Sequence, residues 1–166
     1  MLVAINPGAG FGSSKCWPPD RFAATADILI ERHNCQIVIL SAPKESPIAL
    51  AIETQMKHAV INPVGADVDL HNLKSIVRRC RLLITNDTGP RHYAVAFGLP
   101  VVVIMGSTSP RYTDVNLEKT TKVSVSVPCG PCQRKVCTQP EHLCMIGITP
   151  QRVVDAAEEL LRRSPN

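Results

Sequence analysis

The sequence predicts a doubly wound α/β domain, in which helices cover both faces of a parallel sheet. Three observations support this fold class. Short apolar runs alternate with helical patterns along the whole chain. The richest of these runs are continuous in Val, Ile and Leu, as expected of strands that are buried on both faces. The length of 166 residues, with 45% hydrophobic content, fits one domain spanning residues 1–166.

The expected strands and helices follow in chain order. The apolar runs predict strands at 2–5, 36–40, 59–61, 82–85, 101–105 and 123–127. The intervening patterns predict helices at 20–32, 46–57, 70–79, 91–97 and 150–163. The last helix has a clear start, because Thr149 can cap it and Pro150 occupies a first-turn position. Two segments, 6–17 and 128–148, are long for ordinary loops, and long loops in a compact domain tend to be functional.

Charge and composition narrow the possible partners. The formal net charge of +4 is spread along the chain and forms no basic stripe, and only 4% of the residues are aromatic. Both observations argue against nucleic-acid binding. The basic balance suits an anionic small ligand, or contact with a negatively charged membrane surface. The sequence contains neither an export signal nor a membrane-length apolar run, so we expect a cytoplasmic location.

The first candidate site is the glycine-rich segment after the first expected strand. Gly8, Gly10 and Gly12 would let the backbone approach a phosphate, and Lys15 supplies a positive charge. The spacing matches neither the Walker pattern nor the dinucleotide fingerprint. A flexible surface turn with a solvated lysine is therefore an alternative interpretation.

The second candidate site is the polar cluster that follows the strand at 82–85. Asp87, Thr88 and Gly89 stand at an expected strand-to-helix turn, where Gly89 would permit the tight backbone. Amide groups at that helix start favour an anion, and His92 could donate to a phosphate oxygen. The simpler alternative is that Asp87 or Thr88 only caps the helix.

Two further features leave alternatives open. Glu45 stands about where doubly wound domains place an acid for ribose hydroxyls, although it could equally be a solvated loop residue. The segment 128–148 is a Cys-rich loop that carries Cys129, Cys132, Cys137 and Cys144. Structural zinc, two disulfides and free thiols all fit this spacing, and the odd total of seven cysteines favours a reducing compartment.

Taken in order, these landmarks resemble the C-terminal half of the ADP-heptose:lipopolysaccharide heptosyltransferases. These enzymes form glycosyltransferase family 9, and the likeness is greater to heptosyltransferase II than to heptosyltransferase I. The resemblance covers nearly the whole chain. It rests on Asn6-Pro7-Gly8-Ala9 with Gly12, Lys15, Trp17-Pro18 and Phe22-Ala23, on Asn86-Asp87-Thr88-Gly89 with His92, on Leu99-Pro100 with Gly106-Ser107-Thr108-Ser109-Pro110, and on Ile148-Thr149-Pro150-Gln151-Arg152-Val153.

The resemblance implies a Rossmann-like domain that binds a nucleotide sugar, as the C-terminal half of a GT-B glycosyltransferase. It implies that Lys15 contacts the diphosphate, that Asp87 binds heptose hydroxyls, and that Thr88, Gly89 and His92 hold phosphates. The remaining implied pocket residues are Gly10, Phe11, Glu45 and Val68. Arg91 stands where many relatives carry smaller or apolar residues, so we expect it either to contact phosphate or to face solvent.

The resemblance also implies what the chain lacks. The acceptor domain and its general base, an aspartate, belong to an N-terminal half that is absent from this sequence, so no catalytic residue is expected here. We expect the chain to bind ADP-heptose, without a metal or cofactor, and to transfer little or no heptose to the lipopolysaccharide inner core alone. Peripheral contact with the inner membrane would come with that acceptor. The alternatives are a zinc-stabilised interaction module and one half of a GT-B-like sugar-nucleotide epimerase.

Overall fold

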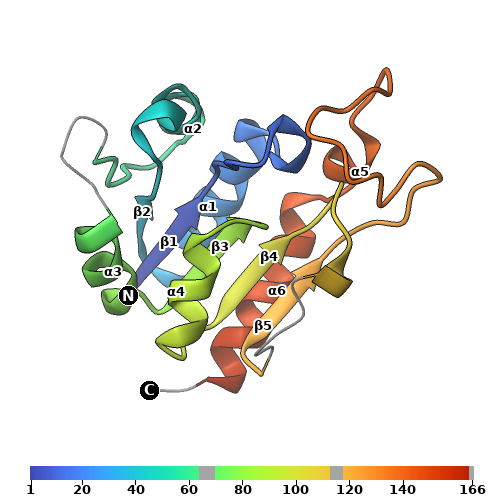
Figure 1. Ribbon diagram of the computed structural model, residues 1–166. Helices are drawn as coiled ribbons and strands as arrows, with labels where there is room; N and C mark the ends of the chain where they lie inside the picture. The colour runs from blue at the N-terminus through green and yellow to red at the C-terminus, as the bar shows by residue number, and fades with distance from the viewer. Residues whose placement is uncertain (64–69, 113–117, 165–166) are drawn as a thin grey trace.

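Five short strands form one parallel sheet in the described part of the computed structural model (Figure 1). The structure describes residues 1–63, 70–112 and 118–164. The strand order is β2-β1-β3-β4-β5, an order found in doubly wound sheets. The strands are β1 (Leu2–Asn6), β2 (Gln36–Ile39), β3 (Leu82–Asn86), β4 (Val101–Ile104) and β5 (Thr120–Val123).

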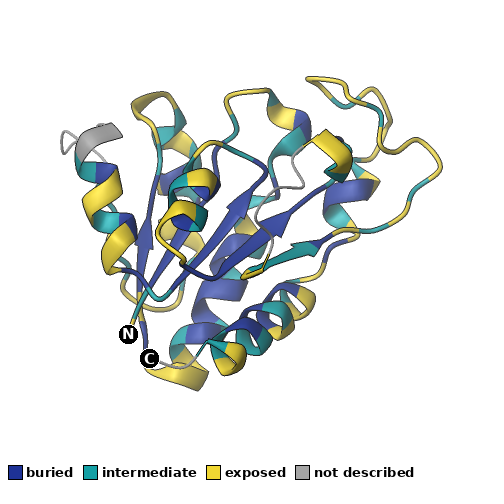
Figure 2. Ribbon diagram, turned by 60° about the horizontal axis from the view of Figure 1, so that its bottom comes forward, coloured by how far each residue is buried: buried dark blue, intermediate teal, exposed yellow. Residues whose placement is uncertain are grey.

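Helices cover both faces of this sheet, which confirms the predicted fold class (Figures 1 and 2). Helices α1 and α6 pack on one face with α2 against α1, and α3 and α4 cover the other. The α-helices are α1 (Pro19–His33), α2 (Ser46–Gln55), α3 (Leu70–Arg79), α4 (Pro90–Ala96), α5 (Leu143–Ile146) and α6 (Pro150–Arg163). Three short 3-10 helices are η1 (Ser13–Lys15), η2 (Pro43–Glu45) and η3 (Pro110–Tyr112). The central strands lie between the helix layers, and their core side chains are nearly inaccessible to solvent.

The expected strand at 59–61 is wrong except for one residue. Only Ile61 pairs with the sheet, in a single parallel bridge to Val38. The segment before it is held by Asp27, a buried residue of α1 whose carboxylate accepts hydrogen bonds from the backbone N–H groups of Lys57 and His58. These bonds fix the chain after α2 and explain why that helix ends at Gln55, two residues earlier than expected.

The last strand is also displaced from its predicted position at 123–127. β5 begins at Thr120 and ends at Val123, where its register partner in β4 is Ile104. Because β4 ends at Ile104, the apolar residues after Val123 have no strand beside them to extend the ladder. Val125 and Val127 instead pack against the core from outside the sheet.

The strand order reverses at one point of the sheet, between β1 and β3. β1 and β3 are neighbours, although β2, α2 and α3 separate them in sequence. The connections that leave their carboxyl ends run to opposite faces, with α1 on one side and α4 on the other. Such a point opens a crevice beyond the strand ends, and this is where ligands bind in doubly wound proteins.

Candidate functional site

The loops after β1 and β3 meet at this crevice and line one groove. It has a volume of about 300 Å³, and the described residues that border it belong to two segments, 10–15 and 87–92. The lining residues are Gly10, Phe11, Lys15, Asp87, Thr88, Gly89 and His92. The two segments singled out in the sequence therefore converge on the same edge of the sheet.

Two buried asparagine side chains join the ends of β1 and β3. Asn6 donates from Nδ2 to the carbonyl oxygen of Leu40 at 2.6 Å and accepts from Oγ1 of Thr88 at 2.8 Å. Asn86 donates from Nδ2 to the carbonyl oxygen of Pro7 at 2.6 Å and accepts from the backbone N–H of Trp17 at 3.2 Å. Because buried polar groups are costly to leave unpaired, these amides fix both loops against the sheet edge.

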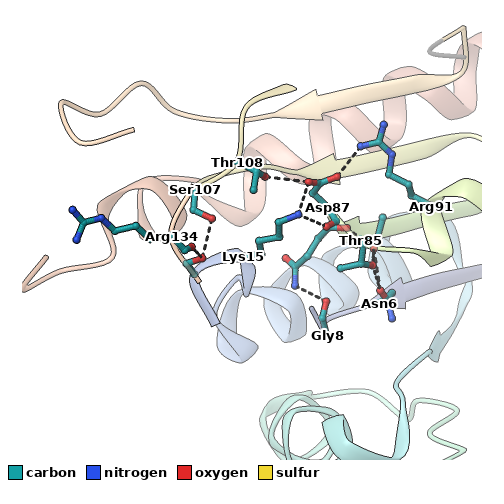
Figure 3. Close-up of polar contacts among 12 residues, drawn as sticks. Asn6, Gly8, Lys15, Thr85, Asp87, Arg91, Ser107, Thr108 and Arg134 are labelled. Atoms are coloured by element: carbon teal, nitrogen blue, oxygen red, sulfur yellow. Dashed lines mark hydrogen bonds and ion pairs between the residues drawn. The ribbon is translucent and has the colours of Figure 1, made fainter. Parts of the chain in front are cut away.

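The Asp87 carboxylate is the centre of the site, and three side chains converge on it (Figure 3). Lys15 Nζ lies 2.8 Å from Oδ2, Thr108 Oγ1 donates to the same oxygen at 3.0 Å, and Arg91 Nη1 lies 2.9 Å from Oδ1. Asp87 is 6% exposed and Arg91 1% exposed, so both charges are removed from bulk water. Removal of one partner from a buried ion pair strongly destabilises the folded protein, because the other charge stays buried without a counter-ion.

The same contacts determine the protonation of Asp87. Burial alone would raise the pKa of its carboxyl group. The hydrogen bond and charge of Lys15, the hydrogen bond of Thr108 and the charge of Arg91 together outweigh burial and lower this pKa below its ordinary value. Asp87 is therefore a carboxylate at neutral pH.

Lys15 is held in place before any ligand is present. Its ammonium group also donates to the backbone carbonyl oxygen of Asp87 at 3.1 Å and lies 4.9 Å from the centre of the Phe11 ring. An ammonium group has three donors, and Asp87 accepts from two of them. Among the residues that the structure describes, the third donor has no acceptor, so it remains for one in the groove.

Not all of the predicted site residues reach the groove. Glu45, the last residue of η2, accepts a hydrogen bond from the backbone N–H of Ala42 at 3.0 Å, and its carboxylate packs against Gly8 outside the groove. A Cβ atom at Gly8 would lie 1.9 Å from Glu45 Cδ, so a side chain at Gly8 would displace the end of the flexible Glu45 side chain. Val68 lies outside the described residues.

Gly89 differs from its expected role. Its φ of −52° and ψ of −45° are ordinary right-handed helical values, which any residue can adopt. The turn therefore does not need glycine for its backbone, and a Cβ atom at Gly89 would meet no atom within 4 Å. The anion-binding amides are also fewer than expected, because the N–H groups of Arg91 and His92 bond to the carbonyl oxygens of Thr88 and Gly89.

The expectation that Arg91 faces solvent is wrong, because its side chain points inward and is 1% exposed. Arg91 is also not among the described residues that line the groove. Arg91 is one helical turn after Asp87, and neighbours at this spacing lie on the same helix face. The guanidinium group can therefore reach Asp87 from beneath the turn, on the side away from the groove. The four-residue spacing of Asp87 and Arg91 is the signal that could have indicated this ion pair, although a fully buried arginine is rare.

The Cys-rich segment lies beside the first loop. Cys129, Cys132, Cys137 and Cys144 are all free thiols and line a second cavity of about 240 Å³ together with His142. Among residues 1–63, 70–112 and 118–164, no three His, Cys, Asp or Glu side chains are placed to hold a metal ion. The structure thus contains neither of the two disulfides considered from the sequence.

Thr108 and Ser107 are residues of the site that carried no assigned role in the sequence. Thr108 completes the Asp87 cluster, while Ser14 and Ser107 are each 1% exposed and their hydroxyl oxygens lie 3.0 Å apart. The run Gly106-Ser107-Thr108 follows β4, the strand next to β3, at the same carboxyl edge. That position is the signal from which its contribution could have been inferred.

Comparison with known proteins gives one consistent family. The family described as glycosyltransferase family 9 (heptosyltransferase) matches residues 1–142. Lipooligosaccharide heptosyltransferase 2 of Campylobacter jejuni is 31% identical over 98% of this chain and 52% of its own length. Lipopolysaccharide heptosyltransferase 2 of Escherichia coli K12 is 28% identical over 96% of this chain and 47% of its own length.

Solved structures agree with these matches. The structure of E. coli ADP-heptose lipopolysaccharide heptosyltransferase II is 27% identical and aligns with a TM-score of 0.82, over 98% of this chain and 46% of that one. The chain spans about half the length of the curated relatives it matches. Within the described part of the chain, no helix has the length and apolar character needed to cross a membrane.

The lowered pKa of Asp87 predicts a specific pH dependence of stability. The contribution of this carboxylate is fully present above its unfolded-state pKa of about 3.9 and is lost as the pH falls through the lower folded-state value. We expect Asp87→Asn to lower the free energy of unfolding at neutral pH by roughly 3–5 kcal/mol. The difference from wild type should shrink below about pH 4 in urea unfolding experiments.

Asp155 provides the matched control for this experiment. It is an exposed residue of α6 that accepts a hydrogen bond from Gln151. Asp155→Asn should change the unfolding free energy by less than about 0.5 kcal/mol. An Asp87→Asn effect that stays constant from neutral to strongly acidic pH would contradict the proposed ion-pair cluster.

Proposed function

Since this chain belongs to glycosyltransferase family 9, the heptosyltransferases, we propose that it is the donor-binding half of a heptosyltransferase of lipopolysaccharide core synthesis. The donor would be ADP-heptose, bound in the groove between the loops after β1 and β3. The observation that carries this proposal is the convergence of Lys15, Asp87 and His92 on one groove at the switch point of the sheet. That groove combines the basic, acidic and small residues that a diphosphate-linked sugar requires.

The diphosphate would lie between Lys15 and His92. The unused N–H of the Lys15 ammonium would donate to a phosphate oxygen, and the exposed imidazole of His92 would approach from the start of α4. During transfer, negative charge builds up on the departing ADP. A fixed cation beside that charge lowers the barrier, because it needs no reorientation during the reaction.

The sugar would contact Asp87. Its Oδ2 already accepts from Lys15 and Thr108, whereas Oδ1 accepts from Arg91. A carboxylate oxygen can accept two hydrogen bonds, so Oδ1 has room for a hydroxyl donor. Asp87 would in this way hold the sugar hydroxyls while keeping Lys15 directed toward the phosphates.

Gly10 and Gly89 support a ligand in close contact with the backbone. Neither glycine is needed to avoid a clash, since a Cβ atom at either position would meet nothing within 4 Å. Both residues line the groove. A side chain at these positions would occupy the space in which the donor is proposed to lie.

The acceptor side would come from the other half of the enzyme. In the proposed reaction, a base outside this chain deprotonates an acceptor hydroxyl of the lipopolysaccharide core, which displaces ADP with inversion at the anomeric carbon and without a divalent metal. By itself the 166-residue chain would bind donor but transfer little or no heptose, because both the acceptor site and the base would be missing. Contact with the inner membrane would follow from the lipid-anchored acceptor.

The proposal of ADP as the nucleotide is supported by a solved relative. The E. coli heptosyltransferase II structure, 27% identical to this chain, is described as an ADP-heptose lipopolysaccharide heptosyltransferase. Titration with ADP and UDP measures the nucleotide preference of this chain.

Substitution of two glycines should separate ligand binding from stability. We expect Gly89→Ala to leave the unfolding free energy within about 0.5 kcal/mol of wild type and to weaken ADP binding at least about tenfold, because its methyl group enters the groove. Gly98→Ala should do the reverse. Gly98 has a φ of +66° and lies outside the groove, so alanine there should cost about 1 kcal/mol without changing ADP affinity.

Calorimetry would measure ADP affinity in this pair, and urea unfolding would measure stability. Unchanged ADP binding by Gly89→Ala would refute the proposed position of the donor. Loss of binding by Gly98→Ala would show that affinity follows general stability and not the occupied space.

Donor selectivity should depend on Asp87. We expect the wild-type chain to bind ADP-heptose more tightly than ADP, and UDP more weakly than either. Asp87→Asn should reduce the preference for ADP-heptose by roughly 10- to 100-fold, as expected for loss of a charge-assisted hydrogen bond. Calorimetric titration with all three ligands measures this. An unchanged preference would remove Asp87 from the sugar site.

Transfer activity should require a second polypeptide. We expect no heptose transfer from ADP-heptose to a lipopolysaccharide core acceptor by the 166-residue chain alone, and transfer when an N-terminal half from a related heptosyltransferase is added. Mass spectrometry of the acceptor would detect the added heptose. Transfer at full rate by the isolated chain would overturn the proposed division of roles.

A further inference from the structure

The Cys-rich segment carries four thiols that the proposed transfer reaction does not use. All four line the cavity of about 240 Å³ beside the first loop. Cys129 is exposed, Cys132 and Cys137 are half-buried, and Cys144 is buried. Burial, and then the nearby Cys137, Cys129 and Cys132, raise the pKa of the Cys144 thiol. Cys144 is therefore the least reactive of the four, and the accessible thiols lie on segment 129–137.

This segment also holds the turn that carries Lys15. Ser14, one residue before Lys15, donates from its backbone N–H to the carbonyl oxygen of Lys135 at 3.1 Å and from its hydroxyl to the carbonyl oxygen of Arg134. The carbonyl oxygen of Ser14 lies 2.9 Å from Nε2 of His142. Three polar groups of one buried residue are thus fixed by the Cys-rich segment.

Close packing makes this contact sensitive to movement. A Cβ atom at Gly12 would lie 2.2 Å from the carbonyl oxygen of Lys135, so the two backbones touch directly. Between the thiols and this contact lies Gln133, a non-glycine residue with a φ of +57°. Its backbone N–H donates to the carbonyl oxygen of Ser107 at 2.8 Å. Gln133 thus links Cys132 to Arg134, in a strained backbone conformation that its hydrogen bond to Ser107 holds in place.

We propose that Cys129 and Cys132 form a thiol–disulfide site whose oxidation weakens nucleotide binding by displacing Arg134 and Lys135 from Ser14. The pair is separated by only two residues, and each member is accessible to a small disulfide. The two thiols would lose two protons and two electrons to form one S–S bond. A small-molecule disulfide such as glutathione disulfide would take these up and leave as two thiols.

The link to the donor groove is short. Ser14 and Lys15 are successive residues of η1, and Lys15 reaches Asp87 from this turn. A new S–S bond fixes the distance between the two sulfur atoms and so changes the turn formed by 129–133. If the carbonyl groups of Arg134 and Lys135 move away, Ser14 loses its hydrogen bonds to them. The turn η1 is then no longer held, and the ammonium group of Lys15 moves with it. The effect on nucleotide affinity rests on the proposed function, whereas the disulfide and the release of Ser14 do not.

The test compares the reduced chain with the chain treated with glutathione disulfide. Mass spectrometry should find one internal disulfide joining Cys129 and Cys132, without a glutathione adduct. Hydrogen exchange should become faster at the Ser14 amide, which is a readout that requires no ligand. ADP affinity measured by calorimetry should fall by at least about fivefold, within the usual range of coupling between two sites.

Variants assign the effect to these thiols. Cys129→Ser and Cys132→Ser should each abolish the response in exchange and in affinity, while Cys137→Ser should retain it. Cys80→Ser is the matched control, because Cys80 is a buried cysteine after α3 and outside both the groove and the cavity. Ser14→Ala should show a smaller difference between the oxidised and reduced states, since it lacks the hydroxyl contact to Arg134.

The outcomes separate this proposal from the proposed function. Absence of the Cys129–Cys132 disulfide, formation of glutathione adducts alone, or a disulfide with unchanged exchange at Ser14 would each overturn the thiol–disulfide site. If oxidation speeds exchange at Ser14 but the reduced chain binds no ADP, the proposed function is refuted and the link between the disulfide and Ser14 stands.

Discussion

The buried carboxylate of Asp87 is the interaction on which the rest of the site depends. It receives Lys15 from the loop after β1, Thr108 from the loop after β4 and Arg91 from α4. Three separate parts of the chain therefore meet at one negative charge, in surroundings where an unpaired charge would be costly. Folding and the arrangement of the groove are linked through this cluster, because the same contacts that satisfy the carboxylate also direct the lysine.

The sheet makes this meeting possible, and the family assignment gives it a chemical meaning. β1, β3 and β4 lie side by side, so their carboxyl ends bring distant segments to one edge. The chain belongs to the heptosyltransferase family, and that edge is where we propose that the nucleotide sugar binds. Lys15 is already held in position by the Asp87 carboxylate. In the proposed reaction the site would therefore not have to reorganise as negative charge builds up on the departing ADP.

The sequence was sufficient for the fold class because hydrophobic periodicity and turn residues are local signals. α6, for example, begins and ends where Thr149, Pro150 and the apolar pattern placed it. The convergence of Lys15 with Asp87 was also predictable, through the resemblance. The inward direction of Arg91 was not predicted, although Asp87 is only four residues away, because a fully buried arginine is rare. The single bridge at Ile61 was not predictable either, because it depends on a strand that is distant in sequence. Local patterns cannot reveal such a neighbour.

The single bridge at Ile61 bears on how the domain behaves in solution. β2 is an outer strand, and its outward backbone groups at Ile37 and Ile39 bond to Ile61 at 2.9 Å each. Pro63, two residues later, has no N–H to offer a further strand. Ile61 thus occupies backbone groups of the outer strand β2 to which the strand of a second chain could otherwise bond. A single residue in this way hinders edge-to-edge aggregation on this side of the sheet.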